Sequence, residues 1–215
     1  DTTFNSAVSA LDLDINTAAA DDVTTFAVGG HVIGDNGTLG GALDVAGGTF
    51  VLGTAIVDGV TVFDTKEVVA TDAGVELRAL VIQPSANFTS GTVTFIDGAT
   101  AASVDDDDVA GVSITDTALT DFTVNITDQV ADVTITAAAK SGATTGTALG
   151  VTTNEGTAIH QLMASAIASD ATVLTALNDN LTSINGGALS VATDLAKQTA
   201  PQTDTIGGSA VATRA

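Results

Sequence analysis

The densest group of side chains that could do chemistry is a run of four acids, Asp105, Asp106, Asp107 and Asp108. Hard cations such as Ca²⁺ take oxygen ligands from carboxylates and backbone carbonyls, so this run is a candidate calcium site. Four neighbouring carboxylates also repel one another unless counter-ions are present. The EF-hand pattern and the glycine-rich calcium-binding nonapeptide are both missing, so a site here would be irregular. The alternative interpretation is a solvated acidic loop without a metal.

Groups suited to catalysis are scarce. We interpret the two histidines, His31 and His160, as turn or surface residues, and no Gly-x-Ser-x-Gly elbow occurs. Paired carboxylates such as Asp12 and Asp14 suit glycoside hydrolysis, but the clefts of such enzymes are normally lined by Trp or Tyr, which this chain lacks. We therefore expect no catalytic site, no bound cofactor other than the candidate calcium, and no enzymatic activity.

Composition excludes further classes of function. The chain has 215 residues, 26 acids and 5 bases, which gives a net charge of -21. Such a charge argues against binding nucleic acid or an anionic membrane surface. The absence of Cys rules out disulfides and Cys-based zinc sites. No apolar run reaches the roughly 18–20 residues that span a bilayer, so we expect no direct membrane span.

Residues 1–154 show the pattern of many short strands. The candidate strands are rich in β-branched residues and are separated by glycine-bearing turns. They are Val23–Val28, Gly41–Val45, Thr49–Leu52, Val60–Phe63, Val75–Ile82, Thr92–Ile96, Val112–Thr115, Phe122–Ile126 and Val133–Thr136. No clear helical stretch lies between them, and the spacing overlaps that of solenoid turns. We predict a mainly β fold, a parallel β-helix or other solenoid, with a β-sandwich as the alternative.

Residues 155–215 change to helical periodicity. An apolar stripe runs along one face from Ile159 to Ile167, and a second helical pattern follows Asp170. A third run, Ala188–Lys197, ends before Pro201. We expect this short α-helical C-terminal segment to act as a cap or linker, because an uncapped solenoid exposes strand edges and aggregates.

The order of several short motifs is familiar. They are Phe95-Ile96-Asp97-Gly98, Phe122-Thr123-Val124-Asn125, Val133-Thr134-Ile135-Thr136, Thr152-Thr153-Asn154-Glu155, the Ala-rich run Ala158–Ile167, and Leu195–Pro201. This order resembles the C-terminal passenger region of type V autotransporter surface proteins, without the β-barrel that follows it in that family. Glu155 stands where the family often has Gln, and Thr199-Ala200-Pro201 where Leu-Ser-Pro is usual. The resemblance implies a right-handed parallel β-helix that is exported through the outer membrane and displayed or released at the cell surface.

Together these features predict a structural, non-catalytic bacterial cell-surface protein, extracellular or held at the surface. It would serve as a surface spacer or as a component of a layer or filament. The expected partners are further copies of the chain or an attached outer-membrane β-barrel. One alternative is an adhesin that binds host or neighbouring cells, although Arg78 and Arg214 are the only arginines and interface hot spots favour Trp, Tyr and Arg. A second alternative is a calcium-dependent surface-layer protein.

Overall fold

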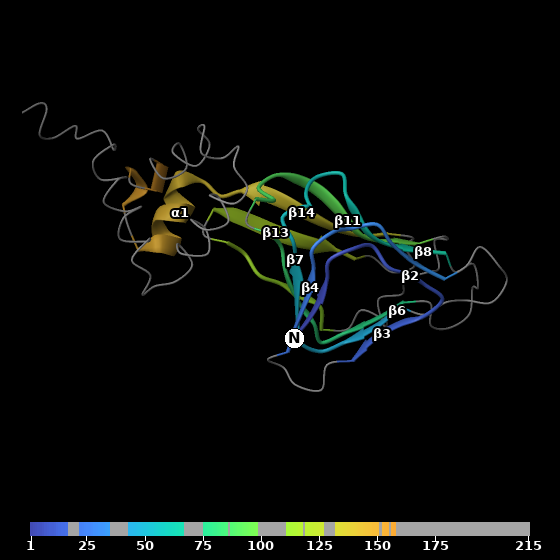
Figure 1. Cartoon of the computed structure of the whole chain (residues 1–215). Helices are drawn as coiled ribbons and strands as arrows, with labels where there is room; N and C mark the ends of the chain where they lie inside the picture. The colour runs from blue at the N-terminus through green and yellow to red at the C-terminus, as the bar shows by residue number, and fades with distance from the viewer. Residues whose placement is uncertain are drawn as a thin grey trace, which may run out of the picture. The chain divides into compact units, whose positions relative to one another are not determined.

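The computed structural model of the chain describes residues 1–16, 22–34, 43–66, 75–85, 87–98, 111–117, 119–126, 132–150, 152–154 and 156–157. The chain divides into two compact units, Asp1–Ala139 and Lys140–Ala215. All of the described strands lie in the first unit, and helix α1 (Gly142–Leu149) lies in the second (Figure 1). In the described part of the chain, no helix is long and apolar enough to cross a membrane.

The first unit consists of short strands joined by turns and loops. The described strands are β1 (Thr2–Phe4), β2 (Ser9–Ala10), β3 (Leu13–Asn16), β4 (Val23–Phe26), β5 (His31–Ile33), β6 (Leu43–Ala46), β7 (Thr49–Leu52), β8 (Thr61–Thr65), β9 (Val75–Arg78), β10 (Val81–Gln83), β11 (Gly91–Gly98), β12 (Ser113–Ile114), β13 (Thr120–Asn125) and β14 (Asp132–Ala139). The prediction of a mainly β fold is therefore confirmed.

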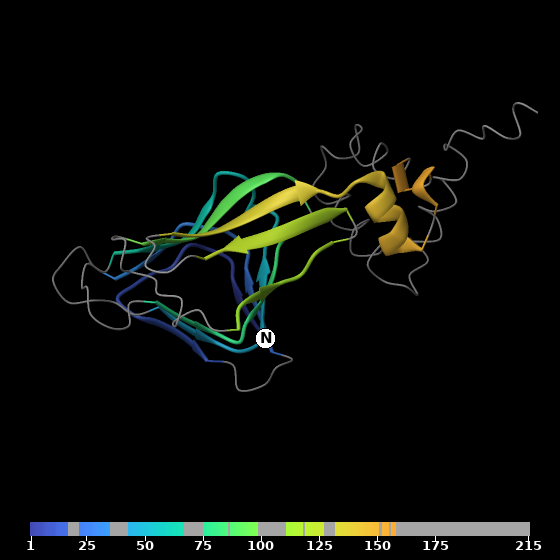
Figure 2. The ribbon, with the colours of Figure 1, turned by 180° about the vertical axis from the view of Figure 1, so that it is seen from behind.

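The strands form three sheets in which strands three apart along the chain lie side by side, except that β12 follows β10 and β13 pairs with β14. Sheet A has the order β1-β4-β7-β10-β12, sheet B the order β13-β14-β11-β8-β5-β2, and sheet C the order β3-β6-β9. All described pairs are parallel except those that β14 makes with β11 and β13. We call β1–β3, β4–β6 and β7–β9 the first, second and third tiers. Figure 1 shows β3 and β6 opposite β2 and β8, with β4 and β7 on a third side, and the view from behind agrees (Figure 2).

Alternation of apolar and polar residues decides which side chains enter the interior. In β6, Leu43 and Val45 are buried while Asp44 between them is only partly covered. β7 repeats the pattern, with Phe50 and Leu52 buried. Successive side chains of a strand point to opposite faces, so this period of two fills one face of each sheet with apolar groups. The buried residues of all three sheets form one hydrophobic cluster.

Aromatic rings join the tiers inside this cluster. Phe26 stacks on Phe4 with ring centroids 5.0 Å apart and on Phe50 at 5.6 Å. Phe63 meets Phe26 edge to face at 5.0 Å, and Phe95 meets Phe63 in the same way at 5.6 Å. Offset and edge-to-face pairs at these distances stabilise a core beyond the area they bury. Phe26 thus contacts phenylalanine rings from β1, β7 and β8, and we take it as the centre of the cluster.

The predicted continuous strand Val75–Ile82 is wrong in one respect, because the chain turns a corner within it. Ala79 has a φ of +52°, a left-handed conformation that ends β9 and directs the chain into β10. The preceding tier makes the same corner with Gly47 and Gly48, whose φ values of +76° and +74° suit glycine. The alanine hid the corner from sequence patterns, which look for Gly or Asn there.

The second unit begins with a helix that the sequence patterns did not reveal. Helix α1 (Gly142–Leu149) starts before residue 154, where the change to helices was expected. Ser141 caps its N-terminus by accepting a hydrogen bond from the Thr144 amide, and Gly150 ends it at a φ of +70°. The backbone of Gly156 packs so closely on the helix that an added Cβ would lie 2.6 Å from the Gly146 amide nitrogen. The helices predicted within 155–215 otherwise lie outside the described residues.

Replacing Phe26 should destabilise the first unit far more than replacing Phe4. Phe26→Ala removes a ring with no exposed surface and leaves a cavity, which typically lowers the free energy of unfolding by about 3–5 kcal/mol. Phe4 is partly exposed and stacks on one side, so we expect Phe4→Ala to lower it by less than half as much. Urea unfolding of both variants at one pH measures the difference. Equal losses would contradict Phe26 as the centre of the core.

Candidate functional site

The predicted calcium ligands Asp105, Asp106, Asp107 and Asp108 lie outside the described residues. Their role therefore stays a prediction. In the ranges that the structure describes, no group of three or more His, Cys, Asp or Glu side chains is arranged to hold a metal ion. The described candidates for chemistry are instead a buried histidine, two series of acids on the sheet surfaces, and a hollow beside the first tier.

The interpretation of His31 as a turn or surface residue is wrong. Its side chain is 0% exposed, at the start of β5. The ring lies among three phenylalanines, with its centroid 5.1 Å from that of Phe26, 5.3 Å from Phe63 and 6.1 Å from Phe4. The preceding glycines suggested a turn, but the spacing of His31 and buried Ile33 places both residues on the inner face of the strand. His160 lies outside the described residues.

Both ring nitrogens of His31 are engaged by backbone groups. Nδ1 accepts a hydrogen bond from the Val8 amide at 3.1 Å, in the connection between β1 and β2. Nε2 lies 2.9 Å from the Val28 carbonyl oxygen. An amide can only donate and a carbonyl can only accept, so this pair of partners requires a neutral ring with its proton on Nε2. Burial lowers the pKa of His31, and the bond to the Val28 carbonyl offsets this only in part.

The outer face of sheet B carries acids in register on three neighbouring strands. Asp64 of β8 is paired with Asp97 of β11, and Asp97 with Asp132 of β14. Neighbouring strands lie about 4.8 Å apart, which brings the like charges close together. Like charges directly opposite one another on a sheet are destabilising. We call Asp64, Asp97 and Asp132 the sheet B acid ladder.

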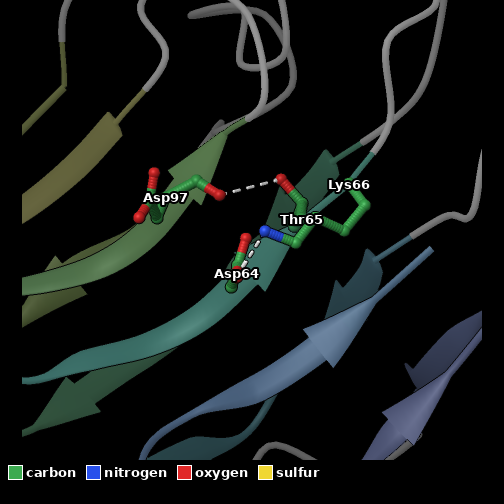
Figure 3. A network of polar contacts seen from close by, with 4 residues as sticks. All are labelled: Asp64, Thr65, Lys66 and Asp97. Atoms are coloured by element: carbon green, nitrogen blue, oxygen red, sulfur yellow. Dashed lines mark hydrogen bonds and ion pairs between the residues drawn. The ribbon is translucent and has the colours of Figure 1, made fainter. Parts of the chain in front are cut away.

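Two nearby groups modify this ladder (Figure 3). Lys66 forms an ion pair with Asp64 at 2.6 Å, and the Thr65 hydroxyl donates a hydrogen bond to the Asp97 carbonyl oxygen at 3.3 Å. Partial desolvation raises the pKa of Asp97, and the charges of Asp132 and Asp64 raise it further, while Lys66 opposes the effect. The side chain of Asp97 is exposed, so water weakens these interactions. The carboxylate of Asp97, in the middle of the ladder, therefore experiences more repulsion from its two acidic neighbours than attraction from Lys66.

Sheet C repeats the arrangement. Asp14 of β3 is in register with Asp44 of β6, and Asp44 with Glu76 of β9. The positions on either side in these strands are apolar in every tier and belong to the core cluster or pack against it. Parallel in-register pairing thus places acidic positions beside one another and apolar positions beside one another, with Asp14 and Asp44 on the outer face and the apolar residues inside. We call these three positions the sheet C acid ladder.

A hollow of about 340 Å³ lies beside the first and second tiers. Its lining combines carboxylates with apolar side chains, and includes Asp1, Asp14, Asp22, Phe4, Leu13 and Ile15. The Asp1 carboxylate already accepts a hydrogen bond from the Val23 amide at 3.2 Å. The described residues of the lining include no histidine, lysine or arginine. Its residues therefore provide acids and hydroxyls, but none of the basic groups that usually activate a nucleophile or bind an anion.

Comparison with known proteins adds no relative, since no protein-family model, curated protein or solved structure matches the chain. The resemblance to the autotransporter passenger region therefore stays a prediction.

Removing the middle charge of the sheet B acid ladder should stabilise the first unit. In Asp97→Asn the repulsion from Asp64 and Asp132 is lost, and a surface pair of this kind is worth about 0.2–1 kcal/mol. The folded-state pKa of Asp97 is raised, so the charged carboxylate lowers the stability of the wild-type chain above that pKa. This loss of stability disappears as the pH falls through that pKa and Asp97 becomes protonated. The gain in melting temperature should thus be present at neutral pH, shrink in acid, and shrink in high salt.

Asp121→Asn is the matched control, because Asp121 is an exposed strand residue whose register partner is Ala138 rather than an acid. Thermal melts of both variants at low and high salt measure the effect. A stabilisation of Asp97→Asn that is equal at neutral and acidic pH would show that the ladder repulsion is not its cause.

Proposed function

We propose that residues 1–139 form a parallel β-helix, in which each tier is one turn of a solenoid with three strands. The pairing of β1, β2 and β3 with β4, β5 and β6, and of these with β7, β8 and β9, supports this proposal. The single cluster formed by the inner residues of three sheets supports it as well. Sandwiches of the immunoglobulin type are built from antiparallel sheets, so the parallel pairing disfavours that alternative.

We further propose that the chain is a structural, non-catalytic protein of the bacterial cell surface, similar to an autotransporter passenger. The single observation that carries this proposal is the division of roles in the tiers. Apolar residues and His31 are used inside to hold the tiers together, while the faces of the ladders present acids to solvent. Such a unit suits a spacer, or a component of a layer or filament, and its charge keeps separate copies soluble.

Self-assembly is the partner interaction that this architecture favours. Within the described residues, β1, β2 and β3 each pair with a strand on one side only, and a sheet edge of this kind can add a strand from another chain. The acid ladders oppose close approach of copies, and cations would reduce that repulsion. We expect assembly to depend on cations for this reason.

The run of acids at residues 105–108 favours one alternative, a surface-layer protein whose assembly requires calcium specifically. No described acids are arranged as a coordination sphere, so the ladders would respond to ionic strength in general. Specific calcium binding would instead be assigned to Asp105, Asp106, Asp107 and Asp108. The two forms of cation dependence can therefore be separated by mutating different residues.

Electron microscopy and light scattering of the full chain should reveal fibres or sheets once cations are added. The Ca²⁺ concentration should be millimolar, on the order of the dissociation constants of extracellular calcium modules. If charge screening controls assembly, we expect Na⁺ at the same ionic strength to have the same effect as Ca²⁺. The triple variant D64N/D97N/D132N should then assemble at lower salt. The quadruple variant D105N/D106N/D107N/D108N is the matched test for specific calcium.

Loss of a calcium-only response in the quadruple variant would favour the calcium-dependent alternative. Dispersed monomers under all of these conditions, together with binding of the chain to cells, would contradict the spacer and layer role and favour an adhesin.

A further inference from the structure

Among the described residues, His31 is the one titratable side chain that the fold buries, and it joins two tiers. It belongs to β5 in the second tier, yet its Nδ1 accepts the amide hydrogen of Val8 from the first tier. Its Nε2 is bonded to the carbonyl of Val28 in the second tier. The ring therefore links the first tier to the second through its acceptor nitrogen.

We propose that His31 is an acid-sensitive lock between the first two tiers, and that protonation of its ring releases the first tier while the third tier stays folded.

Protonation changes one bond directly. A proton taken from water occupies Nδ1, which then becomes a donor that faces the amide donor of Val8 at 3.1 Å. The cation is also enclosed by the rings of Phe4, Phe26 and Phe63 with no exposed surface. Aromatic faces attract a cation weakly, but a buried charge without an ionic partner is strongly unfavourable. Release of the Val8 connection lets water reach the ring.

The described charged groups on the elements that pack around His31 do not supply an ionic partner. Asp1 precedes β1, Asp12 follows β2, Asp22 precedes β4, and Asp64 on β8 is paired with Lys66. The pKa of His31 is set by its burial and by the Val28 carbonyl, and none of these carboxylates contributes to it. Among the described residues, the protonated ring thus has no neighbouring carboxylate that would stabilise it.

The first tier is the part that should open, because less apolar burial holds it. Phe4, Leu13 and Ile15 are only partly buried, and Leu11 is 53% exposed. The corresponding inner residues of the third tier are fully buried. The free energy needed to open a segment locally rises with the number of its buried contacts. Loss of the lock should therefore open the first tier before the third.

The direction of the pH effect follows from the lowered pKa. A histidine whose folded-state pKa lies below its ordinary value of 6.5 contributes full stability above that value. The contribution is lost as the pH falls from 6.5 toward the folded-state pKa. Across this window the equilibrium constant for closing the first tier should fall by up to about tenfold per pH unit.

Hydrogen exchange of the full chain at about pH 7.5 and about pH 5, corrected for intrinsic rates, tests the proposal. We expect protection of residues 2–16 to fall relative to residues 49–52 and 81–83, by up to about tenfold for each pH unit below 6.5. His31→Gln offers one acceptor and one donor without titrating, so its exchange should not show this pH dependence. His160→Gln, which removes the other histidine, should respond as the wild type does.

Side-chain ¹⁵N spectra of the wild-type protein give an independent readout. We expect the Nε2–H tautomer of His31 at neutral pH, and a protonation midpoint below 6.5 that coincides with the loss of protection. A first tier that stays protected when the ring is protonated overturns the proposal, even if His31→Gln fails to fold. So does an unchanged acid response in a folded His31→Gln variant.

Discussion

Hydrogen bonding between strands that lie three apart along the chain is the constraint on which the rest of this structure depends. Parallel in-register pairing places each residue beside its counterpart in the neighbouring tier, about 4.8 Å away. Leu43 therefore lies between Leu13 and Val75, and Phe26 stacks on Phe4. The core is formed by repetition of similar residues at the same place in each tier.

The same constraint sets apolar cohesion against charge repulsion. If Leu43 pairs with Leu13, then Asp44 must pair with Asp14, because the two positions belong to one ladder. A shift of the register by one residue would separate the acids, but it would also turn the apolar residues outward. Burial of Leu and Val side chains contributes about 1.5–3 kcal/mol each, more than an exposed like-charge pair opposes, so the register follows the core. The acid ladders are thus a consequence of the register that the interior requires.

The sequence was informative about strands and less informative about how they connect. The strand at Leu43, Asp44 and Val45 was predicted correctly, because alternation with a period of two is a local property of the sequence. The corner at Ala79 was missed because no Gly or Asn marks it. Helix α1 was missed because its Gly- and Thr-rich sequence has low helix propensity. The close packing of Gly156 on this helix supports it, but this contact forms only in the folded structure and cannot be seen in the sequence.

For the candidate site, too, the sequence showed the residue types but not which residues lie together. The acids were visible as acids, but the ladder of Asp64, Asp97 and Asp132 joins residues more than thirty positions apart and needs the register to be known. His31 was read as a surface residue because its partners, Val8 and Phe63, are distant in the sequence. Its spacing from Ile33 was the available signal for burial. The predicted ligands Asp105 to Asp108 lie outside the described residues, so the prediction about them stands as made.

The antiparallel strand β14 has a consequence for any array of these units. Sheet B runs parallel from β2 to β11 and then reverses at β14, with β13 beyond it. The two described edge strands of sheet B are therefore unlike, because β2 pairs in parallel with β5 whereas β13 pairs antiparallel with β14. If such units joined end to end through these strands, each contact would bring two unlike edges together, and the array would have a direction.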